Sequence, residues 1–175
     1  MYITDDGRTR LYVRMQEGRL SPVLKLYLSK DSQLDIDWGD DTPHSTFTST
    51  SAGYKSERHT YASASDYIIS IGVIRGSFSL QSASALVSGH STLLTNDNAS
   101  LSSPDTGYLN MIRKIEIGND VTFGNGSFNN CRSLSQITIP KSIKSFGQYY
   151  MFYNCSSLSQ ITIPNSVTSI RSYMF

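Results

Sequence analysis

The chain has 175 residues, which is enough for one medium domain or two small ones with a sizeable core. Charged residues make up 17% of it, and 15 Lys and Arg against 14 Asp and Glu leave a formal net charge of +1. This balance excludes a field that steers nucleic acid or anionic membranes, and no apolar run approaches the roughly 18 residues of a spanning helix. We therefore expect no nucleic-acid partner and no membrane insertion.

Residues 9–75 carry the pattern of short β-strands. Apolar and polar side chains alternate with period two in RTRLYVRMQ, in PVLKLYLSK and in QLDIDW. The turn formers GDDTP follow, then a Ser/Thr-rich hairpin region, and then a further strand within HTYASASDYIISIGV. Short strands separated by polar turns predict a small antiparallel sandwich, and no segment shows convincing helical periodicity.

Two motifs in this region, DIDWGDDTP and HTYASASDYIISI, resemble the signature of the polycystic-kidney-disease (PKD) domain family, an immunoglobulin-like sandwich. Asp41 and Asp66 depart from the family pattern, because each stands where glycine is usual. An aspartate at a position that requires a positive φ costs some stability, although less than most residues do. The matching positions are Trp38, Gly39, Asp40, His59, Thr60, Tyr61 and Tyr67.

The residue types at these positions also predict local roles. Trp38, the only tryptophan, ends a strand, and its ring is large enough to close one mouth of the sandwich. Asp40 is expected to accept hydrogen bonds from its own turn. We expect Tyr61 to donate its hydroxyl to nearby main chain, as in a tyrosine corner, and His59 to donate a hydrogen bond within the sandwich.

The segment 76–108 is weakly patterned and rich in Ser, Asn and Gly, with scattered leucines. We interpret it as a connector that partly caps the next unit. The domain prediction is therefore a sandwich over 1–75, a connector and cap over 76–108, and repeats over 109–175.

The phrase SLSQITIP occurs twice, at 133–140 and at 157–164, which is a repeat of 24 residues. A looser third copy lies upstream, so that Ile117, Ile139 and Ile163 follow one another at steps of 22 and 24 residues. The pattern L-x-x-L-x-L at this period is the mark of leucine-rich repeats. One coil cannot bury its own apolar residues, so we expect Ile and Leu of successive coils to stack in one column. Phe128, Phe152 and Phe175 recur in the same way.

The repeat unit is similar to the BspA-like (Treponema-type) leucine-rich repeat family of bacterial surface proteins, closely over 128–175 and loosely over 112–127. The resemblance implies a non-catalytic adhesion module at the cell surface or in the secreted fraction, with host or microbial protein or glycan as partner. A PKD-like sandwich before such repeats implies a surface protein of a gut bacterium. The predicted fold class is mainly β: an Ig/PKD-like sandwich followed by a short, truncated leucine-rich-repeat solenoid.

Exposed positions of the repeat strands would line a concave face, where solenoids often bind partners. The alternatives are a purely structural spacer or stalk, in which these side chains form solvated ladders, and an accessory module of a larger surface hydrolase. The candidate binding residues are Lys114, Glu116, Gln136, Thr138, Gln160 and Thr162.

Catalysis, metal binding and cofactor binding have weak support in the sequence. Cys131 and Cys155 occupy equivalent positions of adjacent coils, and we expect buried free thiols rather than a bridge. The aspartates of DIDWGDD lack EF-hand spacing, so they are interpreted as a solvated face and turn formers. His44, His59 and His90 have no G-x-S-x-G elbow to complete a hydrolase triad. We predict no enzyme, no cofactor and no metal.

The two ends of the sequence suggest an excerpt of a longer protein. The N-terminus shows no signal peptide, so the chain is either cytoplasmic or separated from its export signal. The last repeat stops at Phe175 without a polar cap. We expect an apolar C-terminal end that is prone to pair with another chain.

Overall fold

The computed structural model describes residues 6–81, 93–96, 107–147 and 149–175, and in these ranges the chain is almost entirely β-structure and turns. One short 3-10 helix, Leu109–Met111, is assigned within them. Much of the predicted connector, 82–92 and 97–106, lies outside the described residues. The strands are β1 (Thr9–Arg14), β2 (Val23–Leu28), β3 (Gln33–Asp37), β4 (Ser45–Thr48), β5 (Gly53–Arg58), β6 (Asp66–Arg75), β7 (Phe78–Leu80), β8 (Leu94–Thr95), β9 (Ile112–Glu116), β10 (Val121–Phe123) and β11 (Gln136–Thr138).

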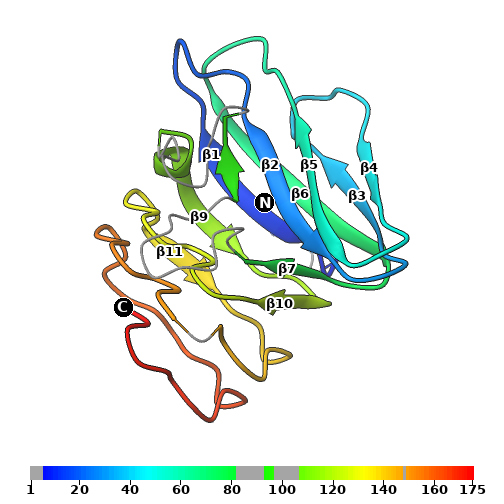
Figure 1. Cartoon of the computed structure of the whole chain (residues 1–175). Coiled ribbons are helices and arrows are strands. Elements are labelled where there is room, and N and C mark those ends of the chain that lie inside the picture. The colour runs from blue at the N-terminus through cyan, green and yellow to red at the C-terminus, as the bar shows by residue number, and fades with distance from the viewer. Residues whose placement is uncertain (1–5, 82–92, 97–106, 148) are drawn as a thin grey trace.

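The strands form two open sheets that lie in layers (Figure 1). The six-stranded sheet has the order β11-β9-β1-β6-β3-β4, and the five-stranded sheet contains β10-β7-β2-β5 with β8 also paired to β2. Pairing among β1 to β6 is antiparallel throughout, as the sequence predicts. The pairs β9–β11 and β7–β10 are parallel, which is the geometry of chain segments that run the same way in successive coils.

The predicted alternation sets the core. Leu11, Leu34 and Ile36 of the six-stranded sheet are fully buried, and so are Leu24 and Leu26 of the five-stranded sheet. These side chains belong to one apolar cluster that continues into the repeats. Because each fully buried Leu or Ile contributes about 1.5–3 kcal/mol, this shared cluster is the main source of stability.

The residues of the WGD and HTY motifs form one network at the end of β3. The indole of Trp38 stacks on the imidazole of His59 with ring centroids 4.6 Å apart. Tyr61 donates its hydroxyl to the main-chain oxygen of Trp38 at 3.0 Å. The Nε2 atom of His59 lies 2.7 Å from Oδ2 of Asp40, and the amide and hydroxyl of Thr42 donate to Oδ1 of the same carboxylate. The predicted hydrogen bonds of Asp40, His59 and Tyr61 are confirmed, whereas closure of one mouth of a sandwich by Trp38 stays a prediction.

The turn between β3 and β4 requires two left-handed residues. Gly39 has φ of 77°, and a Cβ at this position would lie 2.5 Å from the main-chain oxygen of Ile68. Asp41 has φ of 61°, so the aspartate that stands in place of the usual glycine does adopt the left-handed conformation. Asp66, the second departure, is an ordinary strand residue. The PKD-like assignment of the whole region stays a prediction.

We call residues 112–133, 134–157 and 158–175 rungs 1, 2 and 3. The strands of rungs 1 and 2, β9 and β11, pair in parallel so that Ile137 lies beside Ile115. The amide of Ile117 donates to the oxygen of Thr138 at 3.0 Å, which continues the register. Ile137 and Ile139 are buried while Gln136 and Thr138 are exposed, as predicted.

Rung 3 follows rung 2 at the turns but not along the strand. Amide–carbonyl bonds join Phe128 to Met151 at 2.9 Å and Phe152 to Met174 at 2.7 Å. The rings of Phe128, Phe152 and Phe175 stack in the predicted column, with centroids 5.4 and 5.6 Å apart. However, no strand is assigned at 159–163, and Ile163 is only half-buried. The same phrase therefore forms a strand only in rung 2, where β9 lies in register beside it.

The repeats and the N-terminal strands share both sheets, a feature that the sequence pattern does not predict. β9 pairs antiparallel with β1, and Arg10 lies opposite Glu116. β7 and β8 lie within the segment 76–108, and both pair with β2. The first rung thus continues sheets that begin more than 90 residues earlier.

Candidate functional site: the outer face of the repeat strands

The structure brings four of the six predicted binding residues together. Lys114 and Glu116 project from β9, and Gln136 and Thr138 project from β11. The register places Gln136 beside Lys114 and Thr138 beside Glu116. This alignment follows from parallel pairing, because side chains that alternate outward on one strand meet the outward side chains of the next.

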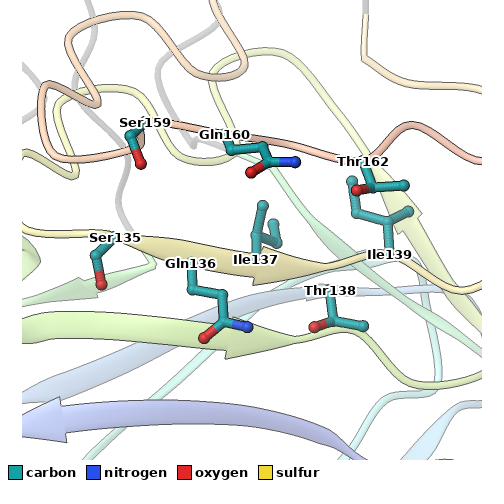
Figure 2. Close-up of a pocket in the computed structure, with 8 residues that line it drawn as sticks. All are labelled: Ser135, Gln136, Ile137, Thr138, Ile139, Ser159, Gln160 and Thr162. Carbon is teal, nitrogen blue, oxygen red and sulfur yellow. The ribbon is translucent and has the colours of Figure 1, made fainter.

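Gln160 and Thr162 lie across a hollow from β11, because the strand segment of rung 3 does not pair with it. The hollow has a volume of about 520 Å³. Figure 2 shows Gln136 and Thr138 pointing one way from β11, while Ile137 and Ile139 point the other way. The hollow is lined by Ser135, Gln136, Ile137, Thr138, Ile139, Ser159, Gln160 and Thr162.

The polar groups around this hollow are carboxamides and hydroxyls. Each of them both donates and accepts hydrogen bonds, and none titrates near neutral pH. Such groups recognise peptide amides or sugar hydroxyls well, but they supply neither a general base nor an activated nucleophile. The arrangement is therefore chemically suited to binding.

The charged pair next to the hollow is neutralised internally. The Nζ atom of Lys114 lies 2.7 Å from Oε1 of Glu116 and 4.7 Å from the ring centroid of Tyr12. Tyr12 donates its hydroxyl to Oε2 of Glu116 at 2.8 Å. Burial raises the pKa of Tyr12 to about 12, and the carboxylate of Glu116 adds to the effect. Burial opposes ionisation of Glu116, but hydrogen bonds from Lys114 and Tyr12 outweigh it and lower the pKa of Glu116.

Tyr12 belongs to an extension of the face that sequence reasoning missed. β1 and β6 continue the sheet beyond β9, and a second hollow of about 400 Å³ lies over them. The alternation in RTRLYVRMQ predicts that Tyr12 faces outward, but no local signal shows that β1 lies beside β9. The hollow is lined by Tyr12, Val13, Arg14, Asp66, Tyr67, Ile68, Arg113 and Lys114.

Two of the acidic residues of DIDWGDD, Asp35 and Asp40, are engaged in separate pairs. Asp35 accepts from Arg8 at 2.8 Å and lies 3.0 Å from Nδ1 of His44, whereas Asp40 lies beside His59 in the motif network. Burial raises the pKa of Asp35, but the hydrogen bonds from Arg8 and His44 outweigh it, so the net shift is downward. No group of three or more metal-ligating side chains gathers within the described ranges. His90 lies outside the described residues.

The two cysteines are buried free thiols, as predicted. The thiol of Cys155 lies 3.1 Å from the main-chain oxygen of Phe128, and Asn154 donates to Asn130 at 3.0 Å in the neighbouring column. Burial raises the pKa of Cys155 to about 12 and raises that of Cys131 well above its usual range. Because the thiolate is the reactive species, neither thiol is an activated nucleophile.

One comparison with known protein families matches the repeat segment. Residues 107–175 match the family model described as "BspA type Leucine rich repeat region (6 copies)". No curated protein and no solved structure matches the chain. The match supports a BspA-like leucine-rich repeat protein over this segment, whereas the PKD-like resemblance has no counterpart among the comparisons.

Repeats of this family are generally non-catalytic modules that mediate protein interactions, and they typically occur on cell-surface or secreted proteins. Within the described ranges, no helix has the length and apolar character needed to cross a bilayer.

Proposed function

We propose that this chain is a non-catalytic adhesion module of a bacterial cell-surface protein, which recognises a host or microbial protein or glycan through the outer face of its repeat strands. The observation that carries the proposal is the register of β9 and β11, which aligns Lys114 with Gln136 and Glu116 with Thr138. The hollow toward Gln160 and Thr162 adds uncharged donors and acceptors to the same face.

The N-terminal strands have a supporting role in this proposal. We infer a PKD-like sandwich that holds the first rung rigid, because β9 pairs along β1. A face built on paired strands presents its side chains at fixed spacing, so less conformational entropy is lost on binding. One rung pair offers few contacts, and avidity in an intact surface protein multiplies them.

The test is a binding array of extracellular-matrix proteins and glycans, probed with the chain displayed in many copies on beads. Gln136→Ala combined with Thr138→Ala should abolish most of the bead binding. The matched control is Gln33→Ala with Thr48→Ala, a Gln/Thr pair that lies opposite across β3 and β4 at the far edge of the same sheet. This control should bind as the unaltered chain does.

The two alternatives give different outcomes. Absence of binding to every protein and glycan on a broad array would favour a structural spacer or stalk. Binding that survives the Gln136 and Thr138 substitutions would remove this face from the proposal. Recognition confined to one polysaccharide, in a gene that also encodes a hydrolase domain for it, would favour the accessory-module alternative.

A further inference from the structure

Tyrosines gather at one turn of rungs 2 and 3, away from the strand face. Tyr150 and Tyr173 occupy equivalent positions, and their rings stack with centroids 5.6 Å apart and planes 20° apart. Tyr153 lies edge-on to Tyr150, also at 5.6 Å. Tyr149, Tyr153 and Tyr173 are 47%, 43% and 67% exposed. We call Tyr149, Tyr150, Tyr153 and Tyr173 the tyrosine ladder.

The backbone of the ladder is strained. Tyr150 has φ of 54° and Tyr173 has φ of 58°, a left-handed conformation that is an outlier for a bulky residue. The equivalent position of rung 1 holds Gly126, with φ of 62°, and glycine adopts this conformation without cost. Rungs 2 and 3 thus place tyrosines at a left-handed position that rung 1 fills with glycine. Strain of this kind, at the half-buried Tyr150 and the exposed Tyr173, points to a role outside the fold.

The surroundings of the ladder favour negative charge. Since Tyr150 and Tyr173 stack on each other, part of each ring face is covered, and Tyr150 is half-buried whereas Tyr173 is exposed. Ring edges carry the positive end of the aromatic quadrupole, and phenol hydroxyls donate hydrogen bonds. The chain has no acidic residue after Asp120. Its charged side chains in that region are the exposed cations Arg132, Lys141, Lys144 and Arg171.

We propose that the tyrosine ladder is a second interaction surface, which docks an acidic patch of a partner protein independently of the strand face. Tyrosine and arginine are the side chains that dominate protein interfaces, because they combine large apolar contact with polar tips at low entropic cost. Exposed cations on a segment that holds no acidic residue favour a carboxylate-rich partner over a basic one. Arg171 lies two residues before Tyr173 in the sequence and is exposed.

The test uses immobilised poly-glutamate as the acidic polypeptide, with poly-lysine and heparin in parallel. The unaltered chain should bind poly-glutamate and should not bind poly-lysine. Its binding to poly-glutamate should weaken as the salt concentration rises. Tyr150→Gly with Tyr173→Gly, which installs the rung 1 residue, should weaken this binding by about tenfold or more. Gln136→Ala with Thr138→Ala should leave it unchanged, so failure of the strand-face proposal is separable from failure of this one.

Three results would overturn the proposal. The first is unchanged poly-glutamate binding by the double glycine variant with a native melting temperature. The second is binding to heparin but not to poly-glutamate, which would assign the surface to sulfated glycan. The third applies if the double glycine variant unfolds, in which case Arg171→Gln replaces it as the test. Unchanged binding of poly-glutamate by Arg171→Gln would refute the docking role and leave the ladder with a structural role alone.

Discussion

Gly147 sets the closest approach between rungs 1 and 2. A Cβ at this position would lie 1.9 Å from the main-chain oxygen of Gly124 and 2.4 Å from its carbonyl carbon. Both obstacles are backbone atoms, so no side chain can rotate away. Gly147→Ala must therefore push the two rungs apart where they touch.

The size of the effect follows from these contacts. Ordinary contact begins at 3.4 Å, so the rungs must separate locally by roughly 1.5 Å. Two inter-rung hydrogen bonds lie close by, Gly126 to Tyr149 and Phe128 to Met151, both 2.9 Å. Each is worth about 0.5–1.5 kcal/mol net, and forced overpacking costs about 1–3 kcal/mol more. We expect Gly147→Ala to lower the free energy of unfolding by about 2–6 kcal/mol.

The measurement is urea denaturation, followed by far-UV circular dichroism and by the fluorescence of Trp38. The matched control is Gly53→Ala, because a Cβ on Gly53 of β5 meets nothing within 4 Å. The control should leave stability unchanged or raise it by up to about 1 kcal/mol. Equal midpoints for the two variants would refute the close stacking of rungs 1 and 2 on which the repeat interpretation rests.

Three further substitutions or treatments test the buried groups. Tyr61→Phe should lower the free energy of unfolding by about 1–3 kcal/mol in urea titration, because the oxygen of Trp38 loses its buried donor; an unchanged midpoint would contradict that bond. Burial raises the pKa of Asp40, but hydrogen bonds from its turn and from His59 lower it below 3.8 overall, so its contribution is complete above that pH and is lost as pH falls through the folded value. Because Asp35 and Glu116 also have lowered pKa values, thermal melting against pH should show a larger acid loss of stability in the unaltered chain than in Asp40→Asn, and identical profiles would contradict a contribution from Asp40. Cys131 and Cys155 should react with iodoacetamide at about pH 8 at least roughly tenfold more slowly in the native state than in urea, by mass spectrometry, and equal rates would show that the thiols are not buried.

Local sequence signals predict strands such as β1 and β3 well because each of them has one buried face. The alternation that buries Leu11 and Val13 also marks Tyr12 as an outward residue, and the structure agrees. The WGD and HTY network was partly predictable for a similar reason. A buried Tyr needs a hydrogen-bond acceptor, and an Asp in a turn accepts hydrogen bonds from the residues that follow it. Edge pairing carries no such signal. Tyr12 and Glu116, which share a hydrogen bond, are 104 residues apart. Neither segment has a sequence pattern that indicates pairing with the other.

The candidate site divides in the same way. Period and alternation placed Gln136 and Thr138 on the outer face, because stacking repeats the same position in every rung. The hollow before Gln160 was not predictable, since the two copies of SLSQITIP are identical in sequence and differ only in their neighbours. The positive φ of Tyr150 was not predictable, because φ is set by the conformation of the turn, and the equivalent residue of rung 1 is a glycine.

The antiparallel pairing of β9 with β1, followed by the parallel pairing of β11 with β9, gives assembly a direction. Closing the long loop between β1 and β9 is the slow, entropically costly step, whereas each later coil closes only some two dozen residues. We therefore expect the N-terminal sheet to form first, with β1 as the template for β9 and β9 as the template for β11. A chain that leaves the ribosome N-terminus first meets these steps in the order in which it can complete them.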